Sequence, residues 1–258
     1  MNILLTLAYN GAAYHGFQVQ QNAVSVCKLL QDAMQNLFKT RPDVKGCSRT
    51  DAGVHARQFY VNFHHDTAIP MEKVPLALNY YLPADIRVLA AQQVPEDFHA
   101  RYSALSKRYR FVILNTNVDD PFVLGQYVKI NTPLKVEAMQ EAARFLLGKH
   151  DFAAFMSAGS TIKDTVRTVM DLQVWRDGDW IYIEIEADGF LYNMVRIISG
   201  TLVQVGQGRM PIIAVPAVLA GGKRQAAGET LAPEGLFLLR VNYQPGTVLG
   251  QNEGKSDG

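Results

Sequence analysis

Large apolar side chains recur at every second position near the start of the chain, at Ile3, Leu5, Leu7 and Tyr9. A period of two is typical of a β-strand with one buried face. Over residues 26–37 the apolar side chains recur three or four positions apart, which is the spacing of a helix with one buried stripe. The same patterns predict strands over 59–63 and 86–94, and between them a short helix over 73–80 that ends before Pro83.

The second half of the chain repeats this order of elements. Residues 169–175 and 181–187 alternate like two paired strands, and Arg176-Asp177-Gly178-Asp179 between them has the composition of a hairpin turn. The other predicted elements are a strand over 106–115, a helix over 136–147 that Gly148 stops, helices over 191–205 and 212–219, and a strand over 236–243. We therefore predict an α+β protein with two similar halves, residues 1–100 and 101–245, and a flexible tail over 246–258.

Length and composition exclude several classes of protein. With 258 residues, 48% of them hydrophobic, the chain can bury one large core or two smaller ones. It has no apolar run of about 18 residues, as a membrane span requires, and its N-terminus lacks the features of a secretory signal. The two cysteines, Cys27 and Cys47, have no metal-binding spacing, so we expect a reducing, cytoplasmic setting and no metal site.

The net charge of +1 does not describe a protein that is basic over its whole surface. Binding to a nucleic acid would therefore require basic residues gathered on one face. Two local clusters meet that requirement along the sequence. Their members are Arg41, Lys45, Arg49 and Arg57 in the first cluster, and Arg101, Lys107, Arg108 and Arg110 in the second. Charge alone favours the simpler interpretation that these are solvated faces.

One candidate for chemistry is Asp51, in the stretch Gly46-Cys47-Ser48-Arg49-Thr50-Asp51-Ala52-Gly53-Val54-His55-Ala56-Arg57. Asp before a small residue and glycine is ordinary turn chemistry, and that alone would explain it. Arg49 lies two positions earlier and, in extended backbone, projects to the same side. A buried guanidinium beside the carboxylate would lower the pKa of Asp51 and keep it ionised, which suits a nucleophile or a base.

Three other candidate residues also have simple structural interpretations. Tyr109 heads an apolar row in a predicted strand, and such a tyrosine usually belongs to the core. Arg196 lies roughly 140° round its predicted helix from the apolar Leu191, which is typical of a solvated helix face. Gln18 belongs to an amide-rich loop that is either simply polar or a contact for RNA.

The stretch 46–57 resembles the Gly-x-Gly-Arg-Thr-Asp-x-Gly-Val-His-Ala motif of the TruA-type tRNA pseudouridine synthases. Further matches occur in the family's order along nearly the whole chain, and together they make the resemblance specific. These matches are Tyr9-Asn10-Gly11, Gly16-Phe17-Gln18-Val19-Gln20, Phe98-His99-Ala100-Arg101, Lys107-Arg108-Tyr109-Arg110-Phe111, Gly148-Lys149-His150-Asp151-Phe152, Gly189-Phe190-Leu191-Tyr192-Asn193-Met194-Val195-Arg196 and Pro233-Glu234-Gly235-Leu236-Phe237-Leu238.

The resemblance implies two ferredoxin-like or RNA-recognition-like lobes whose mainly antiparallel sheets join around a central cleft. It implies a cofactor-free enzyme that converts uridine to pseudouridine at positions 38–40 of the tRNA anticodon arm and works as a homodimer. Asp51 would be the catalytic residue, as nucleophile or as stabiliser of the sugar cation. Arg49 and Arg196 would orient it, and Tyr109 would stack on the target base. RNA contacts are expected from Gln18, Arg57, Arg101, Lys107, Arg108 and Arg110.

Two residues depart from the family pattern, and two other functions are compatible with parts of the sequence. Ser48 stands where the family most often has glycine, and Phe17 stands where tryptophan is commoner. The main rival is a tRNA-binding module or RNA chaperone without turnover. A glycoside hydrolase is more remote, because that chemistry normally uses two carboxylates and no second acid accompanies Asp51 in a matched motif.

Overall fold

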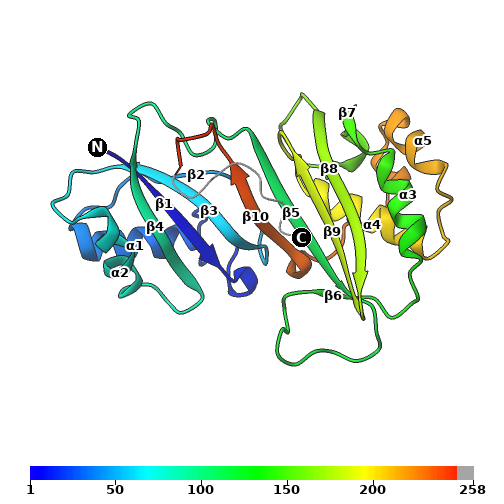
Figure 1. Cartoon of the computed structure of the whole chain (residues 1–258), viewed down its shortest axis with the longest axis horizontal. Coiled ribbons are helices and arrows are strands. Elements are labelled where there is room, and N and C mark those ends of the chain that lie inside the picture. The colour runs from blue at the N-terminus through cyan, green and yellow to red at the C-terminus, as the bar shows by residue number, and fades with distance from the viewer. Residues whose placement is uncertain (249–258) are drawn as a thin grey trace. The chain divides into compact units, whose positions relative to one another are not determined.

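The computed structural model describes residues 1–248 of the chain, which divide into two compact units. The first unit comprises Met1–Ser106 and the C-terminal segment from Leu238, and the second comprises Lys107–Phe237. Figure 1 labels the helices and strands of both. The predicted division fell at residue 100 and assigned the last strand to the second half. In the structure this strand lies beside β3 of the first unit, a pairing partner that periodicity cannot indicate.

The first unit is built on a sheet with the strand order β4-β1-β3-β10, and β2 pairs with part of β3. β1 is antiparallel to both of its neighbours, β3 and β4. The apolar positions of β1 face the core, as the alternation predicted. The strands are β1 (Asn2–Tyr9), β2 (Lys45–Gly46), β3 (His55–His64), β4 (Ile86–Val94) and β10 (Leu236–Asn242).

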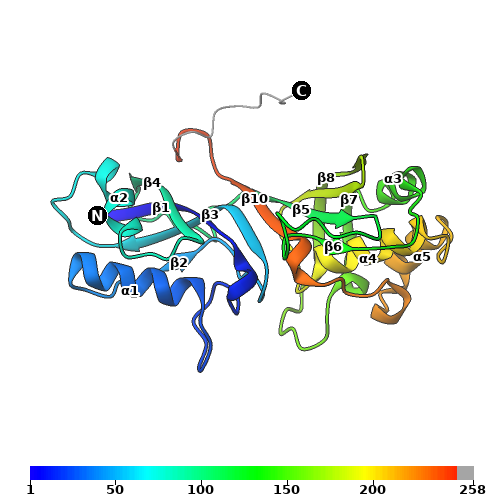
Figure 2. The same cartoon turned by 90° about the horizontal axis from the view of Figure 1, so that it is seen from below.

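Two helices accompany this sheet, α1 (Val26–Phe38) and α2 (Val74–Asn79). α1 lies along one face of the sheet, as Figure 2 shows, and α2 packs on β4. Ser25 caps α1, because its side chain accepts a hydrogen bond from the Lys28 N–H at 3.3 Å. Short 3-10 turns precede the two helices at Gly11–Ala13 and Met71–Lys73. The order strand–helix–strand–strand–helix–strand, with β4-β1-β3-β2 across the sheet, is the ferredoxin-like arrangement.

The second unit repeats the order strand–helix–strand–strand–helix in β5, α3, β8, β9 and α4, with β5-β9-β8-β7 across its sheet. β6 is parallel to β5, whereas β9 is antiparallel to both β5 and β8. The strands are β5 (Ser106–Leu114), β6 (Val128–Lys129), β7 (Gly148–Asp151), β8 (Val166–Asp177) and β9 (Trp180–Ala187). The helices are α3 (Val136–Arg144), α4 (Met194–Gly206) and α5 (Ala214–Gly221), with 3-10 turns at Ala153–Phe155, Arg224–Ala226 and Pro233–Gly235.

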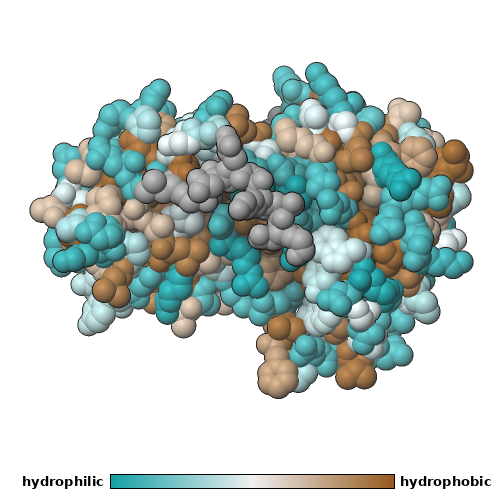
Figure 3. All heavy atoms as spheres, in the orientation of Figure 1, coloured by the Kyte–Doolittle hydropathy of each residue, from teal (hydrophilic) through white to brown (hydrophobic). Residues whose placement is uncertain are grey.

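A long connection between β5 and β6 exposes apolar side chains. Val118, Phe122 and Leu124 are all exposed there, and Phe122 retains 92% of its accessible surface. Figure 3 shows the corresponding hydrophobic spheres on this loop.

The predicted α+β class with mainly antiparallel strands is confirmed. Nearly all predicted elements occur within a few residues of their predicted bounds, but β6 and β7 were missed and the predicted 191–205 helix begins only at Met194. Asn193 has a φ of +61°, a left-handed conformation that a helix cannot continue through. The joining of the two sheets and the central cleft remain predictions.

Part of the predicted tail belongs to the folded structure. Thr247 accepts a hydrogen bond from the side chain of Gln92 at 3.0 Å, and Val248 is buried. The rest of the predicted tail, residues 249–258, lies outside the described residues.

Two buried asparagines tie the segment that follows β4 to the core. Asn62 donates to Asn2 Oδ1 at 3.0 Å and to the Phe98 carbonyl at 3.1 Å, while its own Oδ1 accepts from the Ala100 N–H at 2.8 Å. Asn2 donates to the carbonyl of Phe98 at 2.9 Å. Buried amides are costly unless satisfied, and these are satisfied by one another and by the backbone.

We therefore predict that Asn62→Ala lowers the free energy of unfolding by about 2 kcal/mol, because it leaves the Ala100 N–H buried without its acceptor. Urea denaturation followed by circular dichroism measures this change. Asn36→Ala, at an exposed position of α1, serves as the control and should have nearly the wild-type midpoint. Equal midpoints for the two variants would contradict the prediction.

Candidate active site

Asp51 belongs to a tight turn between β2 and β3, and we call residues 50–54 the acidic turn. The N–H of Val54 donates to the Asp51 carbonyl at 3.2 Å, and Gly53 has a φ of +79°, which glycine adopts without strain. The Asp51 side chain is half-buried. The structure thus has the turn that the sequence predicted, with one carboxylate on it.

Main-chain hydrogen bonds hold the acidic turn against the segment that follows β1. The Phe17 N–H donates to the Thr50 carbonyl at 3.2 Å, and the Gly53 N–H donates to the Tyr14 carbonyl at 3.1 Å. These bonds engage both ends of the turn. Because they involve backbone atoms, they fix where the turn lies whatever its side chains do.

Glycine is required where the two segments approach most closely. A Cβ atom on Gly16 would lie 2.3 Å from the Thr50 carbonyl oxygen, and Gly16 also has a φ of +80°. A Cβ atom on Gly11 would lie 2.0 Å from the Val54 carbonyl oxygen. Any side chain at either position would push the acidic turn away, so the two glycines set its position.

Two buried side-chain contacts complete this attachment. The hydroxyl groups of Tyr9 and Thr50 are hydrogen bonded at 2.8 Å. His55 is buried, and its Nδ1 accepts the Gly11 N–H at 3.0 Å, so this nitrogen carries no proton. The contact gives His55 a structural part in holding the segment after β1 against the acidic turn.

Tyr14 links the acidic turn to the loop before β4. Its hydroxyl donates to Asp85 Oδ1 at 2.5 Å, and the Asp85 carbonyl accepts the Asn10 N–H at 2.9 Å. Burial, and then the hydrogen bond to Asp85, raise the pKa of Tyr14 far above its usual value, so the phenol stays a neutral donor. Sequence reasoning missed this link, because 71 residues separate the two partners.

Arg49 is exposed, whereas the sequence pattern suggested a buried guanidinium, and its position beside Asp51 stays a prediction. The departures from the family pattern are easily accommodated. Ser48 is not among the described non-glycine residues with a positive φ, so the backbone there does not demand glycine. Phe17 packs its ring 4.3 Å from that of Phe59 and so fills its place in the core.

In the second unit, Tyr109 lies on β5 opposite Ile185 and is only 6% exposed. Its ring meets the ring of Phe190 edge-on, with centroids 5.0 Å apart and an interplanar angle of 79°. This burial agrees with the core packing that the apolar row predicted. The edge-on contact also fixes the orientation of the phenol ring.

Arg196, on the first turn of α4, is oriented rather than freely solvated. Its Nε donates to the Leu231 carbonyl at 2.6 Å, and its Nη1 donates to Asn193 Oδ1 at 2.7 Å. Asn193 in turn donates to Ser157 Oγ at 2.9 Å. These hydrogen bonds argue against the simple alternative of a solvated helix face, and the role of Arg196 toward Asp51 stays a prediction. Asn193 thus orients the Arg196 side chain, a contact that the sequence pattern did not reveal.

Arg108 and Arg110 project from the other face of β5 into a cluster of carboxylates. Arg108 forms ion pairs with Asp171 and Glu184 at 2.9 Å and with Glu186 at 2.7 Å, and Arg110 pairs with Glu184 at 2.7 Å. Burial alone lowers the pKa of Arg108, but hydrogen bonds to Glu184 and Glu186 outweigh it and raise the pKa further above its usual value. These ion pairs explain the presence of both arginines without an RNA ligand.

The other predicted RNA contacts are accessible in varying degree. Gln18 and Arg57 are exposed, whereas Arg101 and Lys107 are half-buried. Gln18 directly follows Phe17, whose N–H binds the acidic turn, so it lies close to that turn along the chain. Gln18, Arg57 and Arg101 belong to the first unit and Lys107 to the second.

Residues 1–248 meet the requirements of neither a metal site nor a membrane-spanning helix. Within residues 1–248, no three His, Cys, Asp or Glu side chains stand together in a way that could hold a metal ion. No helix in this part of the chain combines the length and apolar character needed to cross a membrane.

Comparison with known proteins defines the class. Residues 6–103 and 142–244 match the family described as tRNA pseudouridine synthase, and the chain belongs to that family. It is accordingly a pseudouridine synthase, which favours an enzyme over a non-catalytic tRNA-binding module.

Individual relatives agree over nearly their full length. The chain is 46% identical to tRNA pseudouridine synthase A of Thermoanaerobacter sp. strain X514, over 94% of this chain and 99% of that protein. It is 44% identical to the protein of the same name from Halalkalibacterium halodurans, over 95% and 93% of the two chains. A solved H/ACA RNP structure aligns at 10% identity and a TM-score of 0.38, too low to support an argument.

The close approach at Gly16 gives a prediction for activity. Gly16→Ala should lower the rate of pseudouridine formation in tRNA by about 100-fold or more, because small displacements of a reacting group have effects of that size. Tritium release from C5-labelled uridine in tRNA measures the rate. Gly178→Ala is the matched control, since Gly178 also has a positive φ but a Cβ atom there meets nothing within 4 Å. An equal loss of activity in both variants would contradict this account.

Proposed function

We propose that this protein converts uridine to pseudouridine in the anticodon arm of tRNA, at positions 38–40, with Asp51 as its catalytic carboxylate. The reaction breaks the C1′–N1 bond of the uridine and forms a C1′–C5 bond. The hydrogen on C5 leaves as a proton, and N1 gains one. No electron transfer is needed, so the proposal requires no redox cofactor.

The observation that carries the proposal is the double attachment of the acidic turn. Backbone hydrogen bonds from Phe17 and to Tyr14, together with close packing at Gly16, hold a half-buried carboxylate on a rigid support. A catalytic group gains most from such preorganisation, because none of the binding free energy has to be spent on ordering it. A structural aspartate in an ordinary turn needs no such support.

The other site residues receive roles that suit their chemistry. Tyr109, whose ring orientation Phe190 fixes, is proposed to contact the extruded uracil once the tRNA is bound and so to offset part of the few kcal/mol that base flipping costs. Arg196 offers a guanidinium held by Asn193, suited to keeping Asp51 ionised or to binding a phosphate. Arg49, being exposed, is better suited to an RNA phosphate than to a buried ion pair.

Recognition of tRNA is proposed to use shape and phosphate contacts more than base reading. Gln18, Arg57, Arg101 and Lys107 are the proposed contacts. The proposal leaves out Arg108 and Arg110, because carboxylates already pair with both. A homodimer acting in the cytoplasm completes the proposal.

The carboxylate role of Asp51 predicts that Asp51→Asn and Asp51→Ala each lose at least about 100-fold in turnover, since neither an amide nor a methyl group supplies the nucleophile or the stabilising charge. Tritium release from C5-labelled tRNA measures turnover, and tRNA binding should persist. Asp66→Asn is the control, an equally small change at an exposed acid of the same unit. Retained turnover in either Asp51 variant would end the assignment.

The choice of positions is tested separately. In tRNA from cells that lack this protein, uridines 38, 39 and 40 should remain unmodified, while pseudouridines elsewhere in the same tRNAs should persist. Mapping of pseudouridine by chemical labelling and sequencing measures this. Loss of pseudouridine only at another position would keep the chemistry and refute the proposed target.

A further inference from the structure

An exposed aromatic side chain stands beside a cation in the first unit. Tyr102 retains 76% of its accessible surface. The ring of His99 lies 4.4 Å from the Tyr102 ring at an angle of 42°, and the Arg101 guanidinium lies 5.7 Å from the Tyr102 ring centroid. A large ring exposed next to a cation is the combination that proteins use to stack on unpaired bases.

The backbone that carries these side chains is fixed. His99 and Ser103 exchange hydrogen bonds, with the Ser103 N–H donating to the His99 carbonyl at 2.9 Å and the His99 N–H donating to Ser103 Oγ at 3.1 Å. Ala100 between them is held by Asn62 and by the hydroxyl of Tyr243, which donates to its carbonyl at 2.7 Å. Little ordering free energy would therefore be lost when a ligand binds here.

His99 completes the aromatic pair as a neutral ring. Burial, and then the positive charge of Lys45, lower the pKa of His99 below its usual value, so it is uncharged at neutral pH. Its Nδ1 accepts the Arg101 N–H at 3.1 Å, so the ring proton is on Nε2. A neutral imidazole can support the Tyr102 ring without competing with Arg101 for a phosphate.

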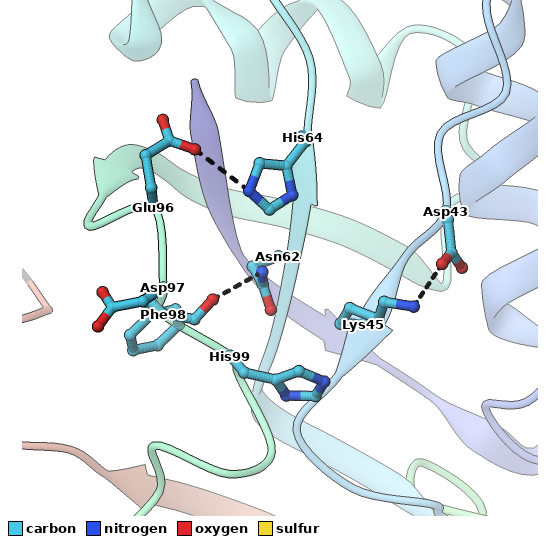
Figure 4. A pocket seen from close by; sticks show the side chains of 8 residues that line it. All are labelled: Asp43, Lys45, Asn62, His64, Glu96, Asp97, Phe98 and His99. Atoms are coloured by element: carbon cyan, nitrogen blue, oxygen red, sulfur yellow. Dashed lines mark hydrogen bonds and ion pairs between the residues drawn. The ribbon is translucent and has the colours of Figure 1, made fainter.

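A polar pocket of about 310 Å³ adjoins His99, which contributes to its lining. Figure 4 shows Lys45 and His99 on one side of this pocket and His64 and Glu96 on another. Lys45 is bound to Asp43, and His64 lies 3.2 Å from Glu96. With Asp97 the pocket holds three carboxylates and one ammonium group, so its charge repels a phosphate.

We propose that Tyr102, supported by His99 and flanked by Arg101, forms a stacking site for an unpaired nucleotide of tRNA other than the target uridine. The base lies on the exposed face of the Tyr102 ring. Its phosphate lies toward Arg101, because the guanidinium attracts it while the carboxylates of the pocket beside His99 repel it. This inference rests on the proposed function, since it takes tRNA as the ligand.

Equilibrium binding of the full-length protein to tRNA tests the stacking site, with Tyr102→Ala and Tyr102→Phe compared. Removing the ring should weaken binding about tenfold, whereas phenylalanine keeps the stacking surface and should bind like wild type. Tyr80→Ala is the matched control, because Tyr80 is 83% exposed in the same unit and packs edge-on against Tyr81. It should leave binding unchanged, and thermal melting should show all three variants folded.

The outcomes separate this inference from the proposed function. If Tyr102→Ala binds tRNA as tightly as Tyr80→Ala, or if Tyr102→Phe loses as much affinity as Tyr102→Ala, there is no stacking site. Tritium release by the wild-type enzyme and its loss in Asp51→Asn would still support the catalytic proposal. Conversely, turnover that survives in Asp51→Asn would overturn the catalytic proposal and leave a selective Tyr102 effect on binding intact.

Discussion

Close packing of one backbone segment on another is the constraint on which the candidate site depends. The segment 11–17 lies so near the acidic turn that there is no room for a Cβ atom at positions 11 and 16, which are both glycine. At such short range, hydrogen bonds between main-chain atoms fix the turn more firmly than flexible side chains could. Tyr14 then connects this pair of segments to Asp85, the residue before β4. The contact anchors the candidate site to the sheet of the first unit.

The role of an arginine in this protein depends on the groups that its guanidinium contacts. Arg108 and Arg110 face carboxylates on neighbouring strands, and their charges are balanced inside the second unit. Arg196 is instead oriented by hydrogen bonds to a carbonyl and to the side-chain amide of Asn193. A guanidinium oriented in this way can act on a carboxylate or a phosphate, whereas one that pairs with several carboxylates of its own unit mainly stabilises the fold.

The periodicity of apolar residues predicted most elements well, because burial of one face imposes that periodicity directly. Ile86–Val94 was predicted with its observed bounds, and α1 differed by a single residue. β7 was missed because its residues Gly148–Asp151 include no apolar alternation, and its pairing with β8 alone makes it a strand. The late start of α4 was missed because it depends on the left-handed conformation of Asn193.

The sequence by itself determined the class of fold, the family motif and the turn that carries Asp51. Each of these is local, since it follows from side-chain spacing or from the conformational preferences of a few consecutive residues. Only the tertiary structure decided which groups meet across long stretches of chain, such as Tyr14 with Asp85, Arg196 with Leu231 and Arg108 with Glu186. Such pairings depend on strand order and helix packing, and the spacing of residues along the sequence does not reveal them.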